Sequence, residues 1–174
     1  MKPAIDLARE AFFASNGLDE AQLAQVFGQL LTKDTTLADL YFQSARYESW
    51  GLEEGIIKSG SYSIEQGVGV RSVCGEQTGF AYSGEISLPA LLESAKAARA
   101  ISSAGQSGTV NTWRVATPSR ALYAQDDPLA SLSESDKIAF LREIDSIARA
   151  TSPYVQQVMA SIVAAHEIIL IIDE

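Results

Sequence analysis

The chain contains one histidine, His166, followed directly by Glu167. This pair could begin the H-E-x-x-H motif, in which two histidines on one helix face bind zinc and the glutamate acts as general base. The motif is incomplete because Leu170 stands in the place of the second histidine. The alternation of apolar residues around it is typical of a strand. We therefore predict an ordinary strand histidine and no metal ligand in this chain.

The other candidates for chemistry are also incomplete. Cys74 is the only cysteine, and a cysteine nucleophile needs a nearby base, usually a histidine; we predict a small apolar filler instead. The glycine-rich run 67–70 lacks the helix start and the lysine of a phosphate-binding loop. Glu53 and Glu54 are adjacent in a predicted turn, where we expect solvated carboxylates. The residue chemistry alone therefore predicts no catalytic residue.

Composition limits the classes of partner and location. Thirteen basic and twenty-two acidic residues give a formal net charge of −9, which argues against nucleic-acid binding because phosphate contacts need clustered lysine and arginine. Charges interrupt the first residues where a signal peptide needs an apolar core. The longest apolar run, residues 168–172, is too short to cross a membrane. The sequence predicts one cytoplasmic domain over residues 1–174, with neither nucleic acid nor membrane as partner.

Helical periodicity predicts four helices. The first covers residues 3–15, and the second follows Asp19, a good capping residue. The third follows Ser87 and has Pro89 in its first turn. A long loop with few apolar residues is predicted over residues 102–132, and we expect it to be mobile. The fourth helix is predicted to begin near Ser133, with either Ser131 and Glu134 or Ser133 and Asp136 as its capping pair. Its predicted inward side chains are Ile138, Leu141, Ile144 and Ala148.

Period-two alternation predicts strands between the helices. The first strand covers residues 38–52, and shorter strands near 56–64, 66–73 and 78–83 complete an antiparallel meander. The last segment alternates from Val158 and becomes fully apolar at residues 168–172, a pattern typical of a strand covered on both faces. The predicted fold class is α+β, with a largely antiparallel sheet packed against about four helices.

One face of the predicted meander has unusually small residues. Gly67 and Gly69 alternate with Val68 and Val70, and glycine inside a strand costs roughly 0.5–1 kcal/mol relative to alanine. Either another element packs closely against this face, or aromatic side chains cover the bare backbone. The residues singled out as structural or contact positions are Gly67, Gly69, Arg71, Phe80 and Tyr82.

The turn after Cys74 leaves two registers open. A two-residue loop at Gly75-Glu76 places Gly69 opposite Tyr82 and Arg71 opposite Phe80. A three-residue loop places Val70 opposite Tyr82 and separates bulky from small residues. The sequence does not choose between these registers.

Long stretches of the chain resemble a known family. The segments ADLYFQSARYESW (38–50), GIIKSGSYSIEQGVGVRSVCGEQTGFAYSGEISL (55–88) and AARAI (97–101) are similar to the first domain of the TldD/PmbA family, once described as modulators of DNA gyrase and now regarded as metallopeptidases. The TldD branch is the closer one. The similarity continues through DDPL (126–129) to the final strand.

The resemblance implies a function that the residues alone do not. Family members are two-domain zinc hydrolases that degrade peptides or unfolded proteins, and a TldD-type subunit assembles with a PmbA (TldE)-type partner. Their zinc motif, H-E-x-x-x-H, lies after the first domain and does not occur here. We therefore expect a non-catalytic N-terminal domain that shapes the substrate chamber and subunit contacts, without the catalytic C-terminal domain. The alternative is a stand-alone module that binds a peptide or protein, for instance at a sheet edge.

Overall fold

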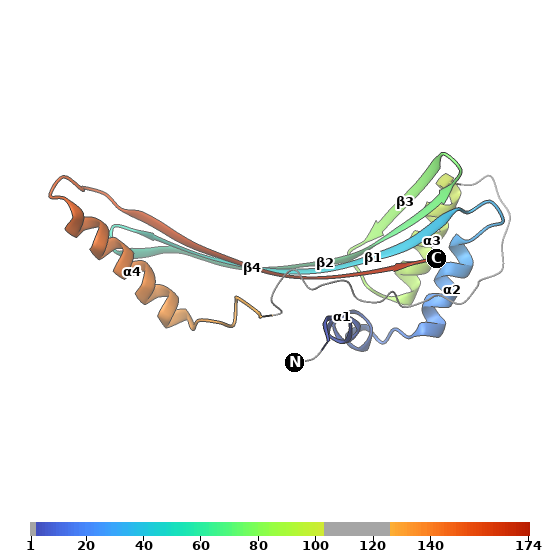
Figure 1. Ribbon diagram of the computed structural model, residues 1–174, viewed down its shortest axis with the longest axis horizontal. Coiled ribbons are helices and arrows are strands. Elements are labelled where there is room, and N and C mark those ends of the chain that lie inside the picture. Colours follow the sequence, from blue (N-terminus) through green and yellow to red (C-terminus); the bar gives the residue numbers. More distant parts are fainter. Residues whose placement is uncertain (1–2, 103–125) are drawn as a thin grey trace. The chain divides into compact units, whose positions relative to one another are not determined.

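The computed structural model describes residues 3–102 and 126–174 (Figure 1). Residues 103–125 of the predicted loop lie outside the described part. None of the described helices is long and apolar enough to cross a membrane. The elements are α1 (Ala4–Phe12), the 3-10 helix η1 (Ala14–Asn16), α2 (Glu20–Leu30), β1 (Leu37–Glu53), β2 (Ile56–Cys74), β3 (Gln77–Ser83), α3 (Leu88–Ser102), α4 (Glu134–Thr151) and β4 (Met159–Asp173).

The described residues form two compact units. Unit 1 contains residues 3–44, 65–102 and 168–174, and unit 2 contains residues 45–64 and 126–167. Strands β1, β2 and β4 each contribute residues to both units.

The four strands form one sheet in the order β3-β2-β1-β4. The backbones of Ala38 and Glu174 exchange two hydrogen bonds, of 3.0 and 2.9 Å, which is the pattern of an antiparallel pair. The predicted α+β fold with an antiparallel sheet and four helices is confirmed. One detail was wrong, because β2 runs without a break where two strands were predicted. Its polar middle remains extended because a strand with exposed side chains needs no apolar alternation.

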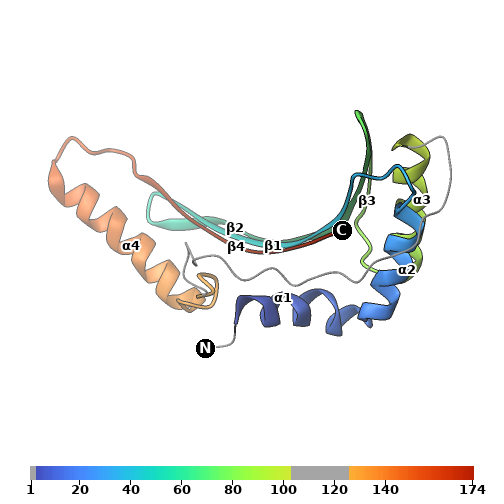
Figure 2. The ribbon, with the colours of Figure 1, turned by 45° about the vertical axis from the view of Figure 1, so that its right-hand side comes forward.

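Unit 1 contains the hydrophobic core. Asp19 caps α2 in a capping box with Gln22, as its sequence suggests. Helix α3 packs on β3 and on α2 (Figure 2). The rings of Phe12 on α1 and Phe42 on β1 pack against each other, with their centroids 5.6 Å apart. The largest fully buried side chains of this core are Phe12, Leu23, Val26, Phe27, Leu30, Leu40, Phe42, Val68, Val70 and Leu91.

The hairpin of β2 and β3 has the two-residue loop. Cys74 pairs with Gln77, Gly69 with Tyr82 and Arg71 with Phe80. Gly75 has φ +60° and Glu76 does not have a positive φ, as expected for a type II′ turn with glycine first. The conformational freedom of Gly75 therefore selects one of the two registers that the sequence left open.

Unit 2 has a much smaller apolar core and a partly ionic interior. Its buried apolar residues are Ala45, Leu52, Leu141 and Val158. On α4 the buried residues are Lys137, Leu141 and Asp145, so the predicted inward stripe was right only at Leu141. Ile138, Ile144 and Ala148 are half-buried. The helix is rotated because Lys137 and Asp145 are each paired with an opposite charge, which makes their burial tolerable.

Strand β4 lies at an edge of the sheet and is covered on one face only. Leu170 and Ile172 join the core, whereas Ile169 and Ile171 are 42% and 59% exposed. The prediction that residues 168–172 are covered on both faces was therefore wrong. The helices of unit 1 cover one face of its sheet, and the side chains of Ile169 and Ile171 point to the other.

Candidate functional site

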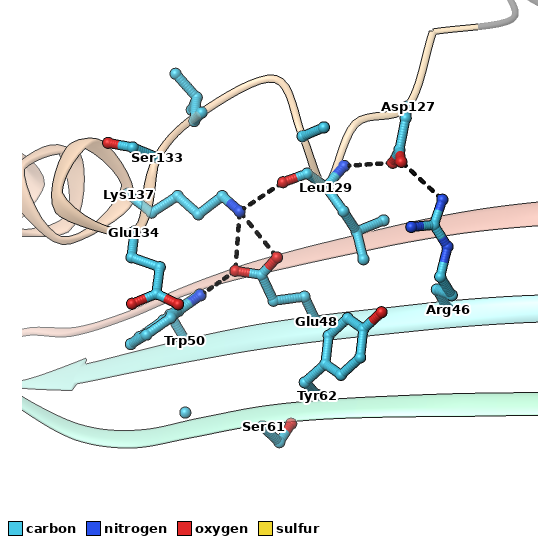
Figure 3. Close-up of a pocket in the computed structure, with 13 residues that line it drawn as sticks. Arg46, Glu48, Trp50, Ser61, Tyr62, Asp127, Leu129, Ser133, Glu134 and Lys137 are labelled. Atoms are coloured by element: carbon cyan, nitrogen blue, oxygen red, sulfur yellow. Dashed lines mark hydrogen bonds and ion pairs between the residues drawn. The ribbon is translucent and has the colours of Figure 1, made fainter.

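A cavity in unit 2 lies between the strand pair β1–β2 and the segment that leads into α4 (Figure 3). Its volume is about 730 Å³, within the range of small-molecule and side-chain pockets. Strands β1 and β2 are joined by a tight turn in which Glu54 and Gly55 both have positive φ. The lining residues are Arg46, Glu48, Trp50, Gly60, Ser61, Tyr62, Asp127, Leu129, Ala130, Leu132, Ser133, Glu134 and Lys137.

A buried ion pair joins α4 to β1 at one end of this pocket. The Nζ atom of Lys137 donates to both oxygens of Glu48, at 2.9 and 2.8 Å, and to the carbonyl of Leu129 at 2.9 Å. Glu48 also accepts a hydrogen bond from the indole N–H of Trp50. The hydrogen bonds from Lys137 and Trp50 hold the pKa of Glu48 below its ordinary value, although burial acts in the opposite direction.

A second ion pair closes the other end of the pocket. Arg46 donates to the Oδ2 atom of Asp127 at 2.7 Å, and the Nδ1 atom of His166 lies 3.0 Å from the same guanidinium nitrogen. Because an arginine can only donate, His166 accepts through Nδ1. Burial tends to raise the pKa of Asp127, but the hydrogen bonds from Arg46 and the Leu129 N–H lower it overall. Figure 3 shows Leu129 pointing toward the strands between the two ion pairs.

The second candidate functional surface is the face of the unit 1 sheet that the described helices do not cover. Arg71 forms an ion pair with Asp39, with its Nε atom 2.7 Å from the Oδ2 atom. Phe80 and Tyr82 are 56% and 80% exposed on β3, and Ile169 and Ile171 are exposed on β4. We call these four exposed residues, with Gly67, Gly69 and Arg71, the open face.

Comparison with known proteins places the chain in a family. Residues 38–102 match the family model of PmbA/TldA metallopeptidase domain 1. A metalloprotease TldD homolog from Haemophilus influenzae is 40% identical over 158 residues, which are 90% of this chain and 33% of the relative. The TldD homolog of Buchnera aphidicola from Schizaphis graminum is 34% identical over 97% of this chain and 35% of its own length.

The matched segment, residues 38–102, belongs to domain 1 of the PmbA/TldA metallopeptidase family. The chain spans about a third of the length of the curated relatives that it matches. Solved structures share its fold at low identity. This chain superposes with a TM-score of 0.61 and 17% identity on a protein named as a modulator of DNA gyrase from Bacteroides thetaiotaomicron, covering 87% of this chain and 36% of that one. TldE from Thermococcus kodakarensis superposes with a TM-score of 0.55 and 15% identity, covering 87% and 34%.

The five residues singled out from the sequence as structural or contact positions lie on the open face. Their role in contacts with a partner stays a prediction. The ring of Phe80, rather than Tyr82, covers Gly69: a Cβ atom added at Gly69 would lie 3.0 and 3.2 Å from two ring carbons. At Gly67 the added atom would lie 2.7 Å from the carbonyl oxygen of Ser83 on β3. The two glycines therefore allow an aromatic ring and a neighbouring backbone to approach the strand closely.

The sequence predictions missed the pocket. Arg46, Glu48 and Lys137 were not singled out, and His166 was read only as a strand histidine. A usable signal was the pair of charged residues at positions 46 and 48 in a strand whose other even-numbered residues, apart from Ser44, are apolar. Among the described residues, no three side chains of histidine, cysteine, aspartate or glutamate lie close enough to hold a metal ion. Cys74 is half-buried, with the hydroxyls of Thr35 and Ser102 at 3.7 and 3.9 Å from Sγ.

The pocket carboxylates predict a specific pH dependence of the stability of this chain. The pKa of Glu48 lies below its ordinary 4.5 and that of Asp127 below its ordinary 3.8. Carboxylates with depressed pKa stabilise the fold fully above their unfolded values, and this contribution is lost as the pH falls through the folded values. We expect the stability advantage of wild type over Glu48→Gln to be constant above about pH 6 and to shrink toward about pH 3.

Urea unfolding followed at several pH values would measure this dependence. Glu143→Gln, which changes an exposed carboxylate of α4, is the matched control and should show no such convergence. A wild-type advantage over Glu48→Gln that stays constant down to about pH 3 would contradict the depressed pKa.

Substitution of Gly69 tests how firmly the open face is packed. Valine at this position would push against the ring of Phe80. Because that ring is more than half exposed and can rotate away, we expect a cost of about 1 kcal/mol, at the low end for overpacking. In thermal melts, Gly69→Ala should lower the melting temperature slightly and Gly69→Val should lower it more. A raised midpoint for valine would show that the ring does not rest on the glycine.

Proposed function

We propose that this chain acts as the non-catalytic first domain of a TldD-like metallopeptidase that degrades peptides or unfolded proteins. The observation that carries the proposal is the 40% identity to a metalloprotease TldD homolog over 90% of this chain and only a third of the relative. The match to domain 1 of the metallopeptidase family supports the same assignment. In this role the chain would shape a substrate chamber and contact another subunit in the cytoplasm.

The open face supports a contact role. It presents two aromatic and two isoleucine side chains from the two edge strands of the unit 1 sheet. Exposed apolar side chains gathered on one face are typical of protein interaction sites. The solved structure of TldE, which shares the fold, supports a PmbA/TldE-type subunit as such a partner. A second copy of the chain is the alternative.

Zinc is the metal that the family resemblance implies for the full-length protein. The described residues do not fit it, because no cluster of three ligand side chains occurs among them, and a catalytic zinc generally takes three protein ligands and a water. We therefore assign no catalytic step to the described residues. Their proposed contribution is binding and shape.

Two measurements test this proposal. A hydrolysis assay on an unfolded model protein, with metal analysis, should show that the chain alone is inactive; chelator-sensitive hydrolysis by the chain alone would contradict a non-catalytic role. A pull-down with the PmbA/TldE-type protein of the same genome should retain the wild-type chain. Tyr82→Ser and Ile171→Ser should weaken retention at least about tenfold, as central contact residues often do.

Tyr154→Ser is the matched control for the pull-down, because Tyr154 is exposed but lies on unit 2. Equal retention of all three variants would contradict a contact through the open face. The gene provides an independent check: an open reading frame that continues beyond codon 174 into H-E-x-x-x-H supports the assignment to a larger peptidase.

A further inference from the structure

Strand β2 has a free edge in unit 2. Strand β3 pairs with residues 68–74 of β2 only, so within the described residues the segment 56–64 has β1 on one side and no strand on the other. Every residue from 58 to 64 is exposed. An unpaired strand edge presents a row of backbone N–H and C=O groups that another extended segment can pair with.

The pocket opens beside this edge. Gly60, Ser61 and Tyr62 belong both to the free segment and to the pocket lining. Alternate side chains of a strand point to the same face of its sheet. A polypeptide strand added to this edge would therefore direct every second side chain to the face on which the pocket lies.

Most charged side chains that line the pocket form ion pairs with one another. Lys137 uses three donors on Glu48 and Leu129, and Arg46 is held by Asp127. The carboxylate of Glu134 has no ion-pair partner among the described residues, and Figure 3 shows it pointing from α4 toward the strand pair. Tyr62 and Leu132 are 57% and 48% exposed and lie in the same lining. The surface available to a ligand is therefore aromatic and aliphatic, with one unpaired negative charge.

We propose that the free edge of residues 56–64 and the adjoining pocket bind an extended, basic segment of another polypeptide. The backbone of that segment pairs with β2, and one of its lysine or arginine side chains enters the pocket. The aliphatic stem of that side chain lies against Tyr62 and Leu132, and its cationic end reaches Glu134. This site lies within unit 2 and is separate from the open face.

The negative charges of Glu134 and of the whole chain favour a basic segment over an acidic segment or a second copy of the chain. A cation gains both from an aromatic face and from a carboxylate, whereas an acidic side chain would be repelled by Glu134. The chain carries a net charge of −9, which favours encounter with basic segments and disfavours pairing with a second copy of itself. The inference does not depend on the peptidase assignment, because it concerns binding by this chain alone.

A fluorescent peptide with one central lysine among alternating threonine and valine residues tests the pocket. Binding is followed by the fluorescence anisotropy of the labelled peptide. We expect norleucine in place of lysine to weaken binding and glutamate to weaken it further. Glu134→Gln should weaken the lysine peptide about threefold to fivefold and leave the norleucine peptide unchanged. Tyr62→Ala should weaken the lysine peptide about tenfold, and Glu143→Gln, the matched control on α4, should have no effect.

The contribution of the strand edge is tested with the same peptide methylated on alternate backbone nitrogens, which removes donors for strand pairing. We expect at least about a tenfold loss of affinity. Failure of the lysine peptide to bind, equal affinities for the lysine and glutamate peptides, or unchanged binding of the methylated peptide would each overturn the proposal. None of these outcomes depends on whether the chain takes part in hydrolysis.

Discussion

Gly79→Ala is expected to destabilise the protein by roughly 3 kcal/mol or more, at or above the upper end for overpacking. A Cβ atom at this position would lie 1.8 Å from the carbonyl oxygen of Ala98 and 3.0 Å from the backbone nitrogen of Ser102. These are backbone atoms of α3, so the clash cannot be relieved by rotating a side chain. The helix itself would have to move away from β3.

Urea unfolding and thermal melts measure this loss. Gly84→Ala is the matched control because a Cβ atom there would meet nothing closer than 3.9 Å, and it should change stability little. A melting midpoint for Gly79→Ala equal to that of Gly84→Ala would show that α3 does not pack as closely on β3 as described. The surrounding residues agree with a close approach, because Ala95 and Ala98 of α3 are fully buried.

Lys137→Met is expected to cost about 3–5 kcal/mol, the usual effect of removing one partner of a buried ion pair. The side chains of Lys137 and Glu48 are only 5% and 13% exposed. Without Lys137, Glu48 keeps its charge or takes up a proton in a site that was formed around a cation. Glu48→Leu should be similarly damaging, because it leaves an ammonium group without its counter-ion.

The double variant Glu48→Leu/Lys137→Met separates the charge effect from packing. Replacement of both charges by apolar groups of similar size is often neutral or stabilising, so we expect it to recover most of the lost stability. The fluorescence of Trp50, whose indole N–H contacts Glu48, follows unfolding next to the pair. Arg9→Met breaks an exposed pair with Glu20 and should cost about 0–1 kcal/mol. Additive losses in the double variant would contradict the coupling.

The sequence predicted the elements whose signals are local. Asp19 caps α2 as expected. Of the two capping pairs that the sequence offered for α4, the structure has Ser133 with Asp136. The fold class followed from the order of the helices and strands, and the family followed from long matching segments. Alternation along one strand fixes which of its residues share a face, so Gly67, Gly69 and Arg71 could be grouped from the sequence. Whether Phe80 and Tyr82 lie on the same face depended on the register of the hairpin, which the sequence left open and the structure gives.

The features that the sequence did not predict depend on distant partners. Lys137 is buried only because Glu48, on β1, faces it, and a lysine in a helix is otherwise expected in solvent. The run of isoleucines in β4 does not reveal that Ile169 and Ile171, on one face of this strand, are exposed. The need for glycine at position 79 arises from the backbone of α3, which no local pattern around β3 indicates. Packing between elements, rather than propensity, decided each of these cases.

The pairing of Ala38 with Glu174 has a consequence for the order of folding. The elements β1, β2, β3 and α3 follow one another along the chain and can assemble from local contacts. The second edge of β1 must wait for β4, which comes after every other described element. Closing so long a loop is entropically costly and slows folding. During synthesis on the ribosome, β1 therefore has an unpaired edge until β4 emerges, and in this interval the nascent chain is most exposed to misassociation and to capture by chaperones.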